Sequence, residues 1–196
     1  MSKTLFFSIF MALALSCTAP EKKNQAEENS SASTNWKSEL EQTLKLFGHR
    51  NWIVIADAAY PQQSNPAIRT ITIDDTQLEA VEFVNQLIEN AGHVDANIFL
   101  DKEMAFVPEK NAKGIASYRE ALDKILVGKN VVTMLHEDII SELDASAELF
   151  HVLIIKTGFS LPYTSVFFQL ECGYWNNDSE KELRDEMLKK QIINRD

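Results

Sequence analysis

Short apolar runs rich in β-branched residues alternate along this chain with longer segments of helical periodicity. Trp52 to Ala56 is a continuous apolar run, as expected for a strand buried on both faces. Further strands are expected at Arg69 to Asp74, Ala96 to Leu100, Val131 to Leu135, Val152 to Ile155 and Val166 to Leu170. This alternation predicts an α/β fold, a single domain with a mostly parallel sheet flanked by helices, in which the last two strands form part of the sheet or an antiparallel or mixed addition.

The intervening segments carry the start and stop signals of helices. Thr76 and Glu79 have the spacing of a capping box for a helix through Ala91, and Gly92 follows as its terminator. Other helices are expected at Trp36 to Phe47, Ile115 to Val127, Glu137 to Leu149 and from Ser179 onward.

The N-terminal segment is expected to lie outside the fold. The apolar run from Leu5 to Leu15 is too short to span a bilayer and is typical of a signal peptide. It ends at Cys17 in a pattern that resembles a bacterial lipobox, so we predict a signal over 1–17 with lipidation of Cys17, a flexible tether over 18–35, and the folded domain over 36–196. The alternative is a plain secretory signal with an incidental cysteine.

Composition excludes several classes of partner and cofactor. The net charge of −10 argues against nucleic acid and against adsorption to anionic lipid. Neither a Gly-x-Gly-x-x-Gly nor a Walker pattern is present, so no nucleotide site is expected. The four histidines lack the spacing of metal ligands, so we predict no metal. Two cysteines do not make a disulfide framework.

Three polar residues stand where chemistry is plausible. His49 follows Gly48 at the end of the first predicted helix, where the helix dipole favours a charged imidazole that can donate a proton. Asp57 and His136 each follow an apolar strand, and the carboxyl ends of strands are where open α/β sheets bind ligands. The alternatives are structural: His49 and His136 as helix-terminal residues, and Asp57 as the cap of a turn. His93 and His151 carry no motif, and structural roles are predicted for both.

Two segments far apart resemble the D-ribose pyranase and L-fucose mutarotase family. They are Gly48 to Pro61, with a Gly-His pair before a strand that ends in Ala-Asp-Ala, and Ile154 to Tyr163, with a Thr-Gly turn before a tyrosine. The resemblance implies His49 as the catalytic residue and Asp57, His136, Tyr163, Thr164 and Ser165 as residues that bind the sugar. His136 is closer to ribose pyranases, because fucose mutarotases more often have Arg in this region.

Two departures from the family pattern concern the second segment. Ser165 replaces an asparagine that contacts the sugar, and Phe159 stands where a glutamate usually follows the Thr-Gly pair. Both substitutions put the identity of the substrate, and activity itself, in question.

The resemblance implies a cofactor-free isomerase that interconverts ring forms or anomers of a free ribose- or fucose-like sugar by acid–base catalysis. It also implies a ring-shaped homo-oligomer, commonly a decamer. The predicted lipid anchor would make this an exported member, held on a bacterial membrane and facing the periplasm or cell surface. Alternatives are a non-catalytic sugar-binding surface lipoprotein with the same fold, or a structural envelope protein that kept only the scaffold.

Overall fold

The computed structural model describes residues 36–193, the last three by their backbone alone, so the predictions for 1–35, including Cys17, fall outside the described residues. Its centre is a single six-stranded sheet in the order β2-β5-β1-β6-β3-β4. The strands are β1 (Trp52–Ala56), β2 (Ile68–Thr72), β3 (Val94–Asp101), β4 (Val131–Met134), β5 (Val152–Lys156) and β6 (Val166–Cys172). The predicted α/β fold with a mostly parallel sheet is confirmed.

One strand runs against the other five. β1, β2 and β5 pair in parallel, as do β3 and β4, whereas β6 is antiparallel to both of its neighbours, β1 and β3. β5 therefore belongs to the parallel set, and β6 is an antiparallel strand at the centre of the sheet. The reason is the connection over residues 157–165, which is too short for a crossover helix and turns the chain straight back.

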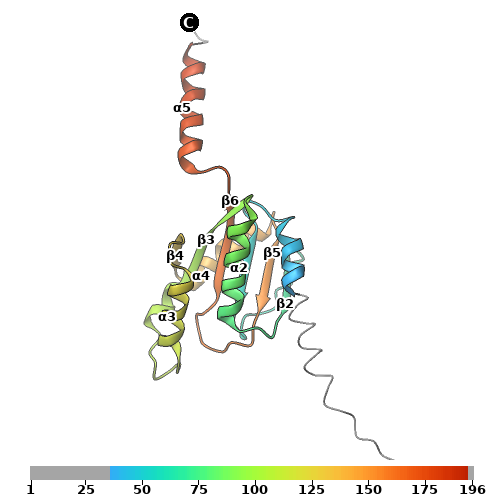
Figure 1. Cartoon of the computed structure of the whole chain (residues 1–196), viewed down its shortest axis with the longest axis vertical. Coiled ribbons are helices and arrows are strands. Elements are labelled where there is room, and N and C mark those ends of the chain that lie inside the picture. The colour runs from blue at the N-terminus through green and yellow to red at the C-terminus, as the bar shows by residue number, and fades with distance from the viewer. Residues whose placement is uncertain (1–35, 194–196) are drawn as a thin grey trace, which may run out of the picture.

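Helices cover both faces of this sheet (Figure 1). The helical residues 36–44, α2 (Gln77–Ala91) and α3 (Ile115–Ile125) pack on one face, and α4 (His136–Ala147) packs on the other. Side chains of β1 alternate between the two cores: Ile53 and Ile55 face the first, while Trp52 and Val54 face the second. The apolar strand predicted from the sequence is thus buried on both sides.

Local signals in the sequence set several helix ends. Thr76 and Glu79 form the predicted capping box of α2, and Gly92 ends that helix with a left-handed φ of 67°. The short 3₁₀ helix η1 (Lys102–Phe106) was not predicted, because runs this short have no hydrophobic periodicity to reveal them.

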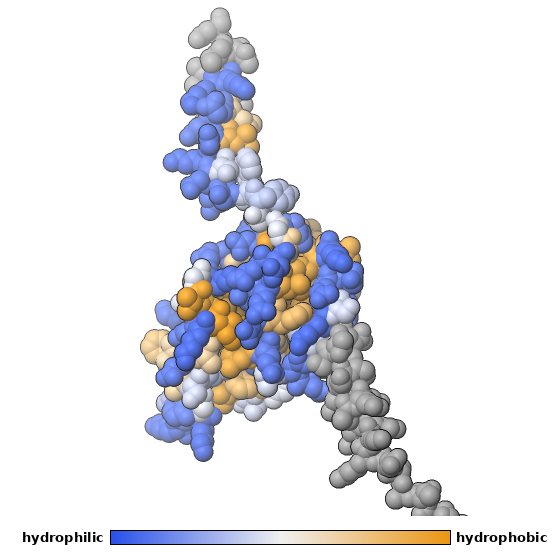
Figure 2. Space-filling view, in the orientation of Figure 1, coloured by the Kyte–Doolittle hydropathy of each residue, from blue (hydrophilic) through white to orange (hydrophobic). Residues whose placement is uncertain are grey.

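The C-terminal helix α5 (Asn177–Ile193) stands away from the rest of the molecule (Figure 1). Its surface is largely hydrophilic, with a small hydrophobic patch (Figure 2). The exposed apolar residues of this helix include Leu183, Met187 and Leu188. Near its start the Trp175 indole donates to Glu180. Among residues 36–193, no helix combines the length and the apolar character needed to cross a membrane.

His93 ties two helix ends together. Its Nδ1 lies 3.0 Å from the carbonyl oxygen of Ala91, at the end of α2. Its Nε2 lies 3.0 Å from the carbonyl of Leu44 and 3.2 Å from that of Phe47, just after the first helix. Because both ring nitrogens face acceptors, the doubly protonated imidazolium satisfies this arrangement best. The structural role predicted for this histidine agrees with these contacts.

Stability is expected to fall as pH rises through the titration of His93. Its hydrogen bond to Ala91 raises the pKa of His93 against the opposing effect of burial. A raised folded-state pKa means that the stabilisation is complete below the pKa of the unfolded chain and is lost above the folded one. We therefore expect stability to decrease with rising pH, starting near the unfolded-chain pKa of about 6.5 and ending above the raised pKa of folded His93. Urea unfolding across this range measures it, and His93→Gln should remove the slope, whereas His151→Gln should keep it.

Candidate functional site

A pocket of about 280 Å³ opens at the edge of the sheet where β1, β3 and β4 end and β6 begins. It is lined by Asp57, Ala59, Tyr60, Pro61, Asp101, His136, Pro162 and Tyr163. A neighbouring hollow of about 360 Å³ shares Asp57, Ala59 and Pro162 with it. The pocket lies at the carboxyl ends of parallel strands, the usual ligand-binding position in open α/β sheets.

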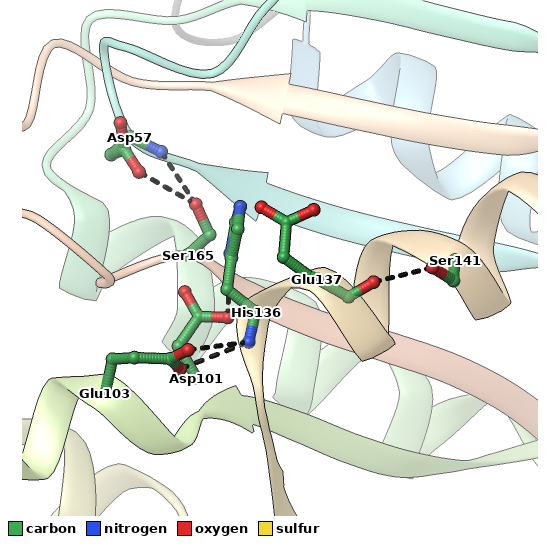
Figure 3. Close-up of polar contacts among 7 residues, drawn as sticks. All are labelled: Asp57, Asp101, Glu103, His136, Glu137, Ser141 and Ser165. Carbon is green, nitrogen blue, oxygen red and sulfur yellow. Dashed lines mark hydrogen bonds and ion pairs between the residues drawn. The ribbon is translucent and has the colours of Figure 1, made fainter.

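One polar contact in this pocket joins the side chains of His136 and Asp101. His136 is the first residue of α4, and its Nδ1 lies 3.0 Å from Oδ1 of Asp101, the last residue of β3. The ring is directed toward the space between Asp57 and Glu137, as Figure 3 shows. A carboxylate at Nδ1 holds the proton on that nitrogen, so the neutral ring presents Nε2 as a proton acceptor.

Asp101 is buried to an unusual degree for a carboxylate, because only 1% of its side chain is exposed. Burial raises the pKa of Asp101, and the hydrogen bond and charge of His136 lower it in part. Its second oxygen, Oδ2, is buried without a hydrogen-bond partner among the described residues. The His136 ring is therefore the principal group that can compensate this carboxylate.

Glu103 fixes the backbone of the same histidine. Its two carboxylate oxygens accept from the His136 amide nitrogen at 3.2 and 3.1 Å (Figure 3). That amide belongs to the first turn of α4, where N–H groups have no partner within the helix. β3 thus holds the ring through Asp101, and η1 holds the main chain through Glu103.

Asp57 directly follows β1, and both of its carboxylate oxygens are engaged. Oδ1 accepts from the Ala59 amide at 2.8 Å, which closes a turn, and Oδ2 accepts from the Ser165 hydroxyl at 3.0 Å. The Ser165 oxygen also accepts from the Asp57 amide at 3.3 Å (Figure 3). The turn-capping and pocket-lining roles considered for Asp57 therefore coexist, since a carboxylate offers about four acceptor positions.

Tyr163 forms an exposed wall of the pocket, with its ring edge-on to His136 at a centroid distance of 5.9 Å. Its φ of 59° is left-handed, a conformation that costs energy in residues other than glycine. The next residue, Thr164, is fully buried. The Thr164 hydroxyl donates to the Leu161 carbonyl, so this side chain supports the loop from inside.

The structure separates His49 from this group. His49 precedes β1 at its amino end, where Nε2 lies 3.1 Å from Oε2 of Glu171 on β6. β1 alone spans roughly 17 Å at about 3.3 Å per residue. The His49 side chain therefore cannot reach the pocket of its own chain, whereas Asp57, His136 and Tyr163 line it together and Ser165 contacts Asp57.

Sequence reasoning missed Asp101 and Glu103. Asp101 ends the run Asn97-Ile98-Phe99-Leu100-Asp101, so it shows the same signal, a carboxylate after an apolar strand, that singled out Asp57. Glu103 had no such signal, because its role depends on how η1 sits against the start of α4.

The arrangement suits a neutral polyhydroxylated ligand and the transfer of protons. The residues that line the pocket offer carboxylate, imidazole and phenol groups, and no lysine or arginine is among them. Carboxylates accept from hydroxyl groups, and an imidazole can both take and give a proton. In the described part of the chain no three His, Cys, Asp or Glu side chains are grouped as metal ligands.

Asp101→Asn is expected to slow proton transfer at His136 without lowering the stability of the fold at neutral pH. Because burial raises the pKa of Asp101, its ionisation costs stability as pH rises through that pKa, and the neutral amide removes the cost. We expect unchanged or higher stability of the variant at neutral pH, with the difference shrinking in acid. The rate of any reaction in which His136 takes up a proton should fall about 10- to 100-fold, because the neutral amide no longer stabilises the positive charge that the ring acquires. Urea unfolding and rate measurements across pH test both; a large loss of stability at neutral pH would contradict the first.

Two solved structures with a bound sugar are similar to this chain. Bacillus subtilis RbsD, solved in complex with D-ribose, superimposes with a TM-score of 0.50 at 17% identity and covers 68% of this chain and 92% of its own. Fucose mutarotase from Streptococcus pneumoniae, solved with L-fucose, gives 0.47 at 21% identity over 68% of this chain and 91% of that one. The first likeness supports the fold.

A search of curated proteins finds no significant match to the chain. A family model described as the RbsD / FucU transport protein family matches residues 32–173, which include every strand and every residue of the pocket and stop short of α5. The resemblance inferred from the two motifs is confirmed, and the chain belongs to the RbsD / FucU family.

Proposed function

We propose that this protein interconverts ring forms or anomers of a free monosaccharide, ribose- or fucose-like, without a cofactor. The observation that carries the proposal is the Asp101–His136 pair in a pocket shared with Asp57 and Tyr163. Family membership and solved relatives in complex with D-ribose and L-fucose support the class of ligand.

The chemistry follows from the orientation of His136. With its Nδ1 proton held by Asp101, Nε2 accepts the proton of the anomeric hydroxyl. The C1–O1 bond becomes a carbonyl, the bond between C1 and the ring oxygen breaks, and the ring oxygen takes up a proton with the released electron pair. Rotation about the bond next to C1 and reversal of these steps give the other anomer. Asp57 and the Tyr163 hydroxyl orient the sugar.

His49 remains the predicted donor to the ring oxygen, and that role requires a second copy of the chain. Since His49 lies at the far end of β1 from the pocket, only the His49 of a neighbouring subunit could reach it. We therefore propose a homo-oligomer with shared sites. Mixing inactive His49→Ala and His136→Ala proteins should restore part of the activity, and a monomeric protein in light scattering would exclude shared sites.

NMR magnetisation exchange between the sugar forms tests the activity directly. The purified full chain is added to D-ribose or L-fucose, and the exchange rate is compared with the spontaneous one. Faster exchange supports an isomerase. Exchange at the spontaneous rate for all common pentoses and hexoses would exclude it.

Two observations favour the second candidate, a non-catalytic sugar-binding protein. Ser165, which stands where the family has asparagine, is 2% exposed, and its hydroxyl donates a hydrogen bond to Asp57. Phe159 packs on Tyr118, with ring centroids 4.9 Å apart, and is not among the residues that line the pocket. Saturable sugar binding without faster exchange would support this candidate.

We also propose that the folded domain is anchored to a bacterial membrane, facing the periplasm or surface, through lipidated Cys17 and the tether 18–35. The apolar segment before Cys17 motivates this. Cys17→Ser should move the protein from the membrane fraction to the soluble fraction. Equal membrane association of the two proteins would contradict it.

A further inference from the structure

Gln77, outside the pocket, is a polar side chain in the core. It is the first residue of α2, directly after the cap Thr76, and it is 1% exposed. An amide in such a position costs free energy unless hydrogen bonds replace those it makes in water. Its partners therefore indicate what the residue does.

Both ends of this amide are hydrogen-bonded. Nε2 donates to the Ile55 carbonyl at 3.2 Å and to the Thr164 carbonyl at 2.9 Å. Oε1 accepts from the Thr157 hydroxyl at 2.6 Å. The two amide hydrogens and the amide oxygen are thus bound to β1 and to two points of the connection between β5 and β6.

Each of these segments leads into the pocket. Ile55 lies two residues before Asp57, and Thr164 lies between Tyr163 and Ser165. Thr157 opens the loop 157–165, and its hydroxyl also accepts from the Phe159 amide at 3.2 Å. Gln77 therefore links the end of β1 to both ends of the loop that carries Tyr163.

We propose that Gln77 is a positioning residue that holds this loop against the end of β1, so that Ser165 can orient the Asp57 carboxylate and Tyr163 can form the pocket wall. The proposal rests on the proposed sugar site. Without the amide, two buried carbonyl groups lose a donor, although Tyr118 still donates to Thr164 at 2.8 Å.

Loss of the Gln77 hydrogen bonds is expected to weaken sugar binding more than it slows the chemical step. The Asp101–His136 pair is held by β3 and α4, and Gln77 makes no hydrogen bond to it. Gln77→Met keeps the length of the side chain and removes its hydrogen bonds. We expect KM for the sugar to rise about tenfold, with kcat and the pH profile close to wild type, because ground-state contacts of Asp57 and Tyr163 are weakened.

Amide hydrogen exchange gives a readout that needs no activity. In the full chain, Gln77→Met should speed exchange of the amides in 157–165. Val84→Ala is the matched control, since Val84 lies on the same helix, is fully buried and makes no contact of this kind. At equal loss of stability it should leave loop exchange, KM and sugar affinity at wild-type values.

The outcomes separate the two proposals. A wild-type protein that neither binds nor converts sugar overturns the proposed function, and with it the role of Gln77 in a sugar site, while loop exchange still reports whether Gln77 holds the loop. If the wild type binds sugar but Gln77→Met and Val84→Ala have the same KM and the same loop exchange, the role of Gln77 is overturned and the proposed function is not. If Gln77→Met does not fold, Thr157→Val removes one of the same hydrogen bonds and should shift KM and loop exchange in the same direction.

Discussion

His136→Ala is expected to slow the exchange of sugar anomers by about 100- to 10,000-fold, the usual contribution of one general acid–base group. The imidazole is the group in the pocket that can accept a proton and return it, and Asp101 holds it in the tautomer with Nε2 free. The side chain is 30% exposed and lies at a helix start, but its removal leaves the buried Asp101 carboxylate without its partner, so we also expect a loss of stability. NMR magnetisation exchange measures the rate, and circular dichroism confirms folding.

His151→Ala is the matched control for this loss. His151 is exposed and lies at the start of β5, at the other end of the strands, with only a long contact of 3.4 Å to the Ala67 carbonyl. We expect it to retain the wild-type rate. A folded His136→Ala protein with wild-type exchange would remove the acid–base role from this residue. In that case the His49→Ala variant tests whether His49 is the acid–base group of the reaction.

Trp52→Ala is expected to lower the free energy of unfolding by about 3–5 kcal/mol. Trp52 opens β1, is fully buried and stacks on Phe99 of β3 with ring centroids 5.4 Å apart. Removing the indole leaves a cavity between the sheet and α4 that neighbouring side chains cannot fill completely. A loss of this size is a large share of the stability of a single domain. Urea unfolding monitored by circular dichroism measures it.

Two further variants show whether the loss comes from packing. Trp175→Ala removes the same side chain where it is 46% exposed, and we expect a change below about 1 kcal/mol. Trp52→Phe keeps an aromatic ring and removes Nε1, a buried donor without a partner among the described residues, so it should cost less than alanine. Similar losses for Trp52→Ala and Trp175→Ala would contradict the assignment of Trp52 to the core.

Much of the fold could be predicted because the signals are local. The apolar run Trp52 to Ala56 is a strand with the predicted bounds, and the Thr76–Glu79 capping box is present with its hydrogen bonds. Both depend on residues within a few positions of one another. Asp57 and His136 were singled out by the same kind of signal, a polar residue after an apolar strand.

The sequence by itself determined which segments are strands and helices, and which polar residues stand at strand ends. Only the tertiary structure decided which of those residues meet. The placement of β6 between β1 and β3 brings Ser165 to Asp57, and the neighbouring pair β3–β4 brings Asp101 to His136. The same strand β1 keeps His49 away from them. Strand order results from the packing of the whole core on two helical layers, and no local pattern of residues encodes it.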